Sequence, residues 1–509
     1  MAIPIIAALL LLGAAPLVAA LTPLFGDPAT VWADAFSARV LGLAGRTAVL
    51  GILTALACAA VGVPVARALA RRRGLAGRSL AVLLPLPLIL PPWIAGLAWA
   101  RYVRLSGLWG SVALLTASLW PLVTLFALRG LRAAGSAADA AALARGRTRA
   151  LLAVELPLAL PSILAGMLLI FVFAITDFGV VDFLSFNVAE PFTVLSCEIF
   201  QKWARLESAP QAAAVSVPAL LMALVALALV LLIERGQAGR YRGLPTAAAG
   251  ARTASALGRR LGDAGLLLVT ASLVAPVAVL VAWAARNPDP LATAAAARDD
   301  VLRSVLCGLA TGALVALLGV ATARLSMRLR PRAELALLAL ALLPLAAPGV
   351  LFAVGEIRLW HAPWNPLSDA IYRSPALLVL ALTGRFLPLG VLAARALLLR
   401  QDPAPWDAAR LTGRGPLARW LAVDLPLLAP AVGLACALGY LLSLRELDVV
   451  TLVPAGNSTL VHRLYSLVHI ASDDTTAVLC LLLMALVLVP AAAARLLGVP
   501  GVERRVRDG

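Results

Sequence analysis

Three ionisable side chains interrupt stretches that are otherwise apolar. Asp177 lies in ITDFGVVDF, Glu446 lies in LRELDVV, and Arg385 interrupts the run 375–399. A charged group is costly inside a hydrocarbon layer, so each of these residues is a candidate for a functional pathway. The alternative is that the two carboxylates lie at the boundary of the layer and that Arg385 pairs within a helix bundle or extends to its surface.

Prolines interrupt two other apolar segments. Pro87 and Pro91 lie in LPLPLILPP, and Pro344 and Pro348 lie in LPLAAPG. Proline has no N–H and frees a backbone carbonyl that lipid cannot satisfy, so such segments should face a protein interior. Broken segments at corresponding positions of a repeat indicate a translocation path; the alternative is kinks that only shape helix packing.

The sequence lacks the patterns of several common chemical sites. It contains no HExxH, no CxxC, no GxxxxGK[ST] phosphate-binding loop and no recognisable set of nucleophile, base and orienting residue. We therefore predict a chain that is not an enzyme and holds no metal. His361, His462 and His469 are scattered and are interpreted as surface or packing residues, although metal transport would give them a role.

The composition predicts an integral membrane protein. Of 509 residues, 62% are hydrophobic and 14% are charged, and the mean hydropathy is +0.95, whereas soluble domains are about 45–50% apolar. The fold class is therefore all-α and polytopic, with about twelve spans of about 20 residues each. The spans are expected at 3–24, 47–70, 79–100, 109–128, 157–177, 211–233, 263–284, 302–323, 333–355, 375–398, 426–444 and 475–497.

The basic residues predict the orientation of these spans. The net charge is +17, and 29 of the 43 basic residues fall in alternate connections. Short connections rich in arginine stay in the cytoplasm, so both termini are expected there, and the first span is interpreted as retained rather than as a cleaved signal. The charge thus indicates topology rather than nucleic-acid binding.

The chain contains an internal repeat. AVELPLALP at 153–161 matches AVDLPLLAP at 422–430 with an offset of 269 residues. We predict a first half of six spans at 1–233, a cytoplasmic linker at 234–262 and a second half of six spans at 263–509. A duplicated chain of this kind is also compatible with an ion-coupled secondary transporter.

Two connections, between the fourth and fifth spans of each half, are predicted to hold short helices. In the second half, Asp402 can cap a helix that begins at Pro403, Gly413 can end it in the left-handed conformation, and Pro416 can start the next. In the first half, Ser136 and Asp139 have capping-box spacing and Gly146 can close the helix. A helix without a partner, lying at the membrane surface, is the alternative.

These connections resemble the EAA motif of ABC importer permeases, whose consensus is EAA, three residues, Gly, nine residues and Ile-x-Leu-Pro. The second copy departs from it by Asp for Glu and Val for Ile, and the first copy is more degenerate. The residues that carry the resemblance are Asp407, Ala408, Ala409, Gly413, Gly415, Leu425 and Pro426 in the second half and Ala138, Asp139, Ala140, Gly146, Leu156 and Pro157 in the first.

The resemblance implies the type I ABC importer permease fold and a set of partners. The two short helices would dock on two copies of a separate ABC ATPase subunit, which would bind ATP and Mg, while this chain binds no cofactor. A periplasmic substrate-binding protein would deliver the substrate to a multi-pass permease in the bacterial inner membrane. We expect the Asp407 loop to couple more strongly than the Asp139 loop, because its acidic residue is in the expected position.

At the level of substrate, ITDFGVVDFL and RELDVVTLVPAGNSTLVHRLY resemble the ferric-iron permeases of binding-protein-dependent importers. Thiamine permeases share the fused layout and a similar DFGVV segment. The resemblance therefore implies ferric iron uptake, with thiamine or another small solute as the alternative and a secondary transporter as the other class.

Overall fold

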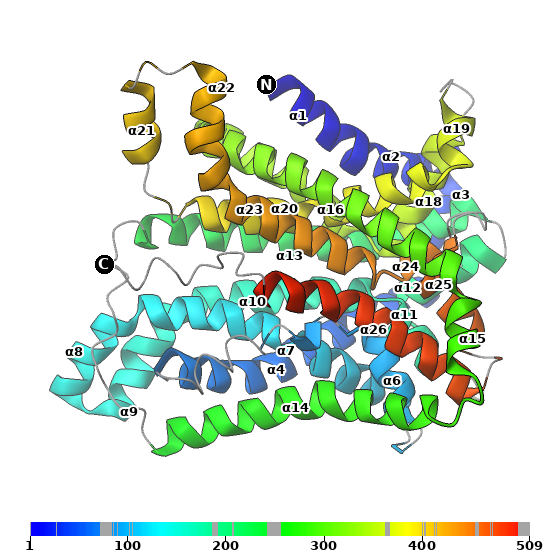
Figure 1. The fold of residues 1–509 in the computed structure, drawn as a ribbon, viewed down its shortest axis with the longest axis horizontal. Helices are drawn as coiled ribbons and strands as arrows, with labels where there is room; N and C mark the ends of the chain where they lie inside the picture. The colour runs from blue at the N-terminus through cyan, green and yellow to red at the C-terminus, as the bar shows by residue number, and fades with distance from the viewer. Residues whose placement is uncertain are drawn as a thin grey trace. The chain divides into compact units, whose positions relative to one another are not determined.

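The computed structural model describes most of the chain as helices joined by turns (Figure 1). The described residues are 2–26, 28–71, 86–88, 90–100, 102–103, 105–185, 192–205, 208–241, 256–361, 367–399, 404–411, 415–452, 458–468 and 472–496, with Leu84, Gln401, Gly413 and Ile470. Within these ranges no residue is in a strand, which confirms the all-α fold class.

Nine helices in the described ranges are long and apolar enough to cross a membrane, and a bent pair makes a tenth. The nine are Ala2–Phe25, Ala38–Ala70, Gly107–Ala133, Leu151–Thr176, Ala209–Gln237, Asp263–Ala284, Arg298–Ser326, Pro375–Leu398 and Leu421–Ser443. Each coincides with a predicted span. The span predicted at 79–100 is only partly described, and α26 (Asp473–Leu496) occupies the span predicted at 475–497.

The span predicted at 333–355 is not one straight helix. Helix α17 (Pro331–Ala346) and helix α18 (Gly349–Trp360) meet at an angle of 102°. The cause is Pro348, which cannot donate a hydrogen bond to the preceding turn, so the helical ladder cannot continue through it. The sequence indicated an interruption here but not a change of direction.

The described chain divides into two compact units, and the first contains residues 1–22, 284–345 and 349–509. Inside this unit α16, α20 and α23 pack on one another and α2 packs on α18 (Figure 1). Gly384 allows a close approach to the N-terminal helix, because a Cβ there would lie 2.0 Å from the Leu12 carbonyl oxygen. Besides α17, α18 and α26, the elements are α1 (Ala2–Leu9), η1 (Leu10–Ala14), α2 (Ala15–Leu21), α15 (Pro290–Ala295), α16 (Arg298–Ser326), α19 (Ser368–Tyr372), α20 (Pro375–Leu398), α21 (Ala404–Leu411), α22 (Pro416–Arg419), η6 (Trp420–Asp424), α23 (Leu425–Ser443), α24 (Asp448–Leu452) and α25 (Leu460–Leu467).

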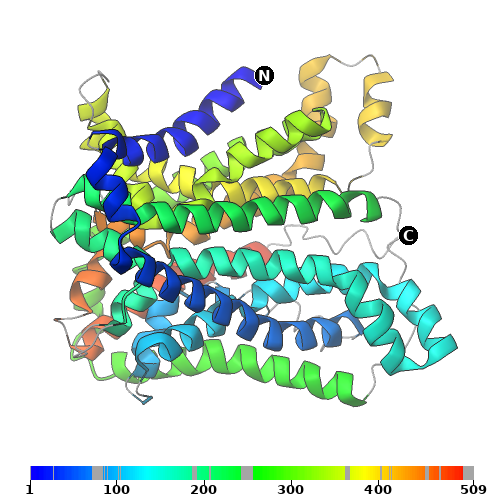
Figure 2. The ribbon, with the colours of Figure 1, turned by 180° about the vertical axis from the view of Figure 1, so that it is seen from behind.

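The second unit contains residues 23–283 together with 346–348. Its centre is α4, α7 and α10, with α13 packed on α10 (Figure 2). Gly265 of α14 packs on α4, because a Cβ there would lie 2.9 Å from the Val65 side chain. The elements are η2 (Thr22–Phe25), α3 (Pro28–Ala35), α4 (Ala38–Arg71), η3 (Leu86–Leu88), α6 (Pro92–Ala100), α7 (Gly107–Ala133), α8 (Gly135–Arg145), α9 (Arg147–Ala150), η4 (Leu151–Glu155), α10 (Leu156–Thr176), α11 (Gly179–Ser185), α12 (Leu195–Phe200), η5 (Gln201–Arg205), α13 (Ala209–Tyr241) and α14 (Ala256–Ala284).

The compact units do not follow chain order. Residues 1–22 belong to the unit that holds most of the second half, and residues up to 283 belong to the unit that holds most of the first. The predicted halves, 1–233 and 263–509, were defined from the sequence repeat rather than from compactness, and they stay a prediction. Helices α13 and α14 extend into the predicted linker 234–262, and its residues 242–255 lie outside the described ranges.

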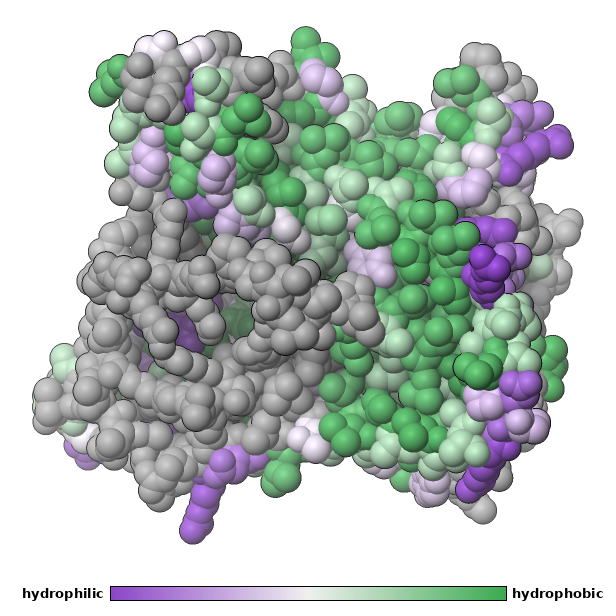
Figure 3. Space-filling view, viewed as in Figure 1, coloured by the Kyte–Doolittle hydropathy of each residue, from purple (hydrophilic) through white to green (hydrophobic). Residues whose placement is uncertain are grey.

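Many apolar side chains remain exposed on these helices, and Figure 3 shows a broad apolar area on the face in view. On α16 alone, Leu302, Leu306 and Leu317 are 54%, 57% and 67% exposed. A soluble protein rarely leaves so much apolar surface in one continuous area. A helix surface of this kind suits contact with lipid, in agreement with a multi-pass membrane protein.

Candidate functional site

The second-half connection contains a short helix, as the sequence predicted. Helix α21 (Ala404–Leu411) is followed by Gly413 with a φ of 66°, and α22 begins at Pro416. A positive φ favours glycine because it has no Cβ to collide with the backbone. Asp402 and Pro403, the expected start of the helix, lie outside the described residues.

The remaining motif residues of this half lie in α21, in the turn after it and at the start of α23: Asp407, Ala408, Ala409, Gly415, Leu425 and Pro426. Ala409 is 6% exposed, whereas Ala408 and Gly415 are exposed. The helix therefore packs one face against the chain and leaves another uncovered in the described structure.

A tryptophan fixes α21 to a transmembrane helix. Trp406 Nε1 donates to Asp424 Oδ1 over 3.1 Å, and the Arg324 guanidinium of α16 donates to the same oxygen over 3.0 Å. The Asp424 side chain is 13% exposed and that of Arg324 is 29% exposed. Asp424 thus connects the short helix α21 to the long helix α16 through these two hydrogen bonds.

The first-half connection holds the corresponding helix, α8 (Gly135–Arg145). Gly146 follows it with a φ of 82°, as expected for a closing glycine. The predicted capping box at Ser136 is wrong: the helix begins at Gly135, its N-cap is Ala134, two residues before Ser136, and no side chain caps it. The reason is continuity with α7, because Ala134 keeps helical angles and its N–H bonds to the carbonyl of Gly130 over 3.0 Å.

The other motif residues of the first half lie in α8 and at the start of α10: Ala138, Asp139, Ala140, Leu156 and Pro157. The residue before Leu156 is Glu155, which is 3% exposed, and its carboxylate lies 3.5 Å from Arg67 Nε of α4. An arginine of a long transmembrane helix therefore meets an acid beside the short helix in this half as well.

The two connections share a geometry that sequence reasoning missed. Glu155 ends the π-helical turn η4, and Asp424 ends the π-helical turn η6. The two acids are 269 residues apart, the offset of the repeat, and Arg67 and Arg324 are 257 apart, the offset that relates Pro87 to Pro344. The offset of 257 residues could have identified Arg67 and Arg324 as equivalent residues. It could not have shown that they pair with Glu155 and Asp424, because that pairing depends on the fold.

The broken span brings together the candidates predicted for the second half. In a continuous helix the Pro344 carbonyl would accept from the N–H of residue 348, but Pro348 has none. Arg385 Nη1 of α20 instead lies 3.4 Å from the Pro344 carbonyl oxygen. The guanidinium therefore satisfies an acceptor that the bend leaves open.

The same arginine lies beside a buried carboxylate. Arg385 Nε and Glu446 Oε1 are 3.8 Å apart, with side chains 9% and 13% exposed, so the contact is electrostatic rather than a direct hydrogen bond. Beyond the break, Gly349 contacts Asp448 so closely that a Cβ there would lie 2.6 Å from Asp448 Oδ2. Pro344, Arg385 and Glu446 therefore form one cluster, in which Arg385 pairs within the helix bundle, and the pathway role stays a prediction.

The first-half candidates do not form the same cluster in the described residues. Asp177 Oδ1 accepts from the Val180 N–H over 2.9 Å and thereby caps α11. Pro87 lies in η3, and the Pro91 carbonyl accepts from the N–H groups of Ile94 and Ala95 at the start of α6. Asp177 thus has a structural role that its match to Glu446 did not suggest.

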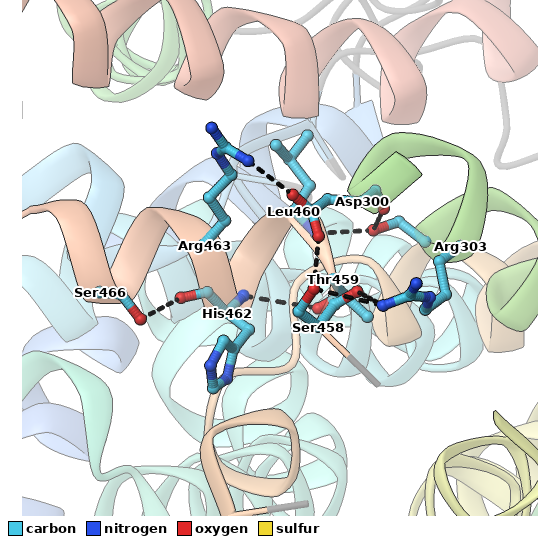
Figure 4. A network of polar contacts seen from close by, with 9 residues as sticks. Asp300, Arg303, Ser458, Thr459, Leu460, His462, Arg463 and Ser466 are labelled. Carbon is cyan, nitrogen blue, oxygen red and sulfur yellow. Dashed lines mark hydrogen bonds and ion pairs between the residues drawn. The ribbon is translucent and has the colours of Figure 1, made fainter. Parts of the chain in front are cut away.

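A polar network joins α16 to α25 (Figure 4). Asp300 accepts from the Ser458 hydroxyl and from Arg463 Nη1, the latter over 3.0 Å, and Arg303 Nη1 donates to the Ser458 carbonyl over 3.0 Å. The Leu460 N–H donates to Ser304 Oγ over 2.9 Å. These bonds fix the start of α25 on α16.

The other unit repeats this junction with the charges exchanged. The Leu195 N–H of α12 donates to Thr47 Oγ1 over 3.0 Å, and Thr47 lies 257 residues before Ser304. Three residues further on, Glu198 pairs with Arg39 at 3.0 Å, whereas the corresponding Arg463 pairs with Asp300. The repeat therefore extends to individual hydrogen bonds.

A second corner, between α15 and α26, carries a half-buried carboxylate. Asn287 Nδ2 donates to Asp474 Oδ2 over 2.9 Å. The hydrogen bond from Ser472, with smaller contributions from the Asp474 backbone N–H and from Asn287, lowers the pKa of Asp474. This residue therefore stays negatively charged at mildly acidic pH.

A small cavity lies beside these elements of the first unit. Its volume is about 10 Å³, room for about one water molecule. It is lined by Ser304, Cys307, Gly308, Leu378, Leu382, Ser443, Leu444, Val450, Thr459 and Val461.

No group of three or more metal-binding side chains occurs among the residues described. His462 Nδ1 contacts the Val450 carbonyl at 3.2 Å, and the His361 ring lies against Tyr372. His469 lies outside the described ranges. The two described histidines have packing or hydrogen-bonding neighbours.

Part of the chain is similar to known transport permeases. The relatives are ABC-transporter permeases. The molybdenum transport system permease protein ModB of Mycobacterium tuberculosis is 34% identical over 142 residues, 24% of this chain and 53% of the relative, and that of Mycobacterium bovis matches equally. A probable molybdenum ABC transporter permease protein of Haloferax volcanii is 32% identical over 167 residues, 30% of this chain and 62% of the relative.

The chain thus spans between half and two thirds of the length of the curated relatives it matches. No protein-family model matches it. The relatives are transport permease subunits, in agreement with a membrane subunit of an ABC system that is not itself an enzyme. None of the three is named for iron.

Proposed function

We propose that this chain is the permease subunit of an ABC importer and that it carries both membrane halves in one polypeptide. The observation that supports this most is the pair α8 and α21: two short helices at equivalent places in the repeat, each closed by a glycine at positive φ. Such helices suit docking on two copies of an ATPase subunit. The sequence has no phosphate-binding loop, so ATP and Mg would be bound by that partner.

The substrate that the relatives favour is molybdate, because they are named for molybdenum transport. A periplasmic binding protein would deliver it to the permease in the cytoplasmic membrane. Ferric iron is the second candidate, since ITDFGVVDFL and the segment after Arg445 resemble ferric-iron permeases. Thiamine and other small solutes are further outcomes of the test.

The translocation path would pass the broken span α17–α18. Arg385 supports this placement for an oxyanion, because a guanidinium binds oxygen pairs through two parallel N–H groups. Glu446 would hold the guanidinium when no substrate is present. In the first half the path would pass Pro87, Pro91 and Asp177.

Reconstitution tests the proposal and its alternatives together. The chain would be placed in proteoliposomes with a candidate ATPase and a candidate binding protein from the same organism, and uptake of radiolabelled molybdate, ferric iron and thiamine would be measured. We expect molybdate uptake that requires ATP and the binding protein. Uptake driven by an ion gradient without the ATPase would overturn the importer class, and uptake of iron or thiamine alone would overturn the substrate.

A further inference from the structure

The two arginine–acid pairs lie where each short helix joins a long one. Asp424 is the last residue of η6 and accepts from both Trp406 of α21 and Arg324 of α16. Glu155 is the last residue of η4 and lies 3.5 Å from Arg67 of α4. Both acids are largely buried, and both arginines project from the corresponding long helix at the same repeat offset.

A π-helical turn is a suitable place for a mechanical joint. It inserts one extra residue per turn into an α-helix, so the hydrogen-bond ladder is locally wider, and such turns concentrate at functional sites. The backbone from each short helix to the long helix that follows it, α10 or α23, passes through one of these irregular turns. In the second half, Trp406 and Arg324 both bond to Asp424, so side chains connect α21 to α16 without passing along the backbone of the turn. In the first half, Arg67 meets Glu155 at the end of η4.

We propose that Arg67–Glu155 and Arg324–Asp424 are transmission contacts, which carry movement of the short helices to α4 and α16. This inference rests on the proposed function, because it assumes that α8 and α21 bind an ATPase. The second-half contact is the stronger of the two, since Trp406 adds a direct hydrogen bond from the short helix itself. An alternative role, stability alone, would make the same pairs matter for folding but not for coupling.

The test uses the complete complex in proteoliposomes and measures substrate molecules transported per ATP hydrolysed. Asp424→Asn and Arg324→Gln should each lower this ratio at least fivefold. The exchanged pair Arg324→Asp with Asp424→Arg should recover at least half of it. Trp406→Phe, which keeps the ring and removes the donor, should lower the ratio about twofold.

A matched pair in the same unit serves as the control. Arg395 of α20 bonds to Glu334 of α17, with side chains 18% and 24% exposed, and neither residue belongs to α21 or η6. Glu334→Gln should leave the ratio unchanged. If Asp424→Asn keeps the wild-type ratio, or lowers it no more than Glu334→Gln does, the inference is wrong.

Two further readouts separate this inference from folding defects and from the proposed function. Melting temperatures identify variants that are merely unstable, and Glu155→Gln with Arg67→Gln repeats the test in the other half. If the wild-type chain neither binds the ATPase nor alters its activity, the proposed function fails. If it does both and the exchanged pair restores nothing in a stably folded protein, only the transmission role fails.

Discussion

Arg385 makes two interactions at the bend between α17 and α18. It lies 3.4 Å from the Pro344 carbonyl oxygen and 3.8 Å from Glu446 Oε1. Because the site is buried, removal of the guanidinium would take a donor from the Pro344 carbonyl and a cation from Glu446, which keeps Arg445 and the Val449 N–H as neighbours. We therefore treat this arginine as the residue on which the local fold depends, whatever its role in transport.

Arg385→Met should lower the free energy of unfolding by about 3 kcal/mol, because it removes one partner of a buried ion pair. Adding Glu446→Gln should recover part of the loss. Melting curves of the purified protein in detergent measure both. Arg373→Met is the control, since Arg373 and Asp369 are each 78% exposed and such a pair is worth about 0–1 kcal/mol. Equal stability of the Arg385 and Arg373 variants would contradict the prediction.

Gly413 shows how one backbone angle fixes the end of α21. Its φ is 66° and no atom lies within 4 Å of the place where a Cβ would be, so the only cost of a side chain is conformational. Gly413→Ala should destabilise α21 by about 1 kcal/mol. Hydrogen exchange of the α21 amides should then speed up roughly fivefold.

Gly433 provides the matched control for that experiment. It also has open space around a Cβ, but it lies inside α23, where alanine is preferred to glycine by about 1 kcal/mol. Gly433→Ala should therefore slow exchange in α23. If Gly413→Ala leaves α21 exchange unchanged, the positive φ is not what ends the helix.

At the scale of elements, the sequence predicted the helices far better than their joints. Apolar runs of about 20 residues located the spans, and Gly413, Gly146 and Pro416 located the ends of short helices, because these signals are local. The contacts around the 102° bend and beside the π-turns η4 and η6 join residues far apart in the chain, so local signals do not predict them. Trp406 and Arg324 were missed for the same reason.

The bend also depends on the absence of a side chain at Gly349. A Cβ there would lie 2.5 Å from Asp448 Cβ and 2.6 Å from its Oδ2, so Gly349→Ala forces α18 and α24 apart. We expect a loss of about 1–3 kcal/mol in the free energy of unfolding, measured by thermal melting. Asp448→Ala should partly rescue this variant.

The control for the bend is a glycine with room for a methyl group. Gly42 of α4 has no atom within 4 Å of a Cβ, so Gly42→Ala should be neutral or stabilising. If the Gly349→Ala and Gly42→Ala proteins have the same melting temperature, α18 and α24 can separate without a loss of stability.

At the scale of the whole molecule, the duplication explains features that no single helix does. The hydroxyls of Thr47 and Ser304 receive equivalent backbone donors, and Glu155 and Asp424 meet equivalent arginines. The two copies nevertheless differ in charge at α12 and α25 and in the tryptophan of α21. The sequence repeat therefore predicted that the two copies share equivalent helices, whereas the side-chain contacts of each copy could be found only in the structure.

The orientation of the spans in the membrane decides whether α21 lies on the cytoplasmic side, where an ATPase could bind it. Arginine-rich connections are retained in the cytoplasm, and α21 lies in one of them, whereas Leu291 of α15, 82% exposed, lies in a connection predicted to be outside. In a chain whose five native cysteines are replaced, Leu291→Cys should react with a membrane-impermeant maleimide in intact spheroplasts. Ala408→Cys should react only after permeabilisation. Labelling of Cys at 408 from outside would invert the topology and, because ATP is hydrolysed in the cytoplasm, would remove α21 from any role in coupling.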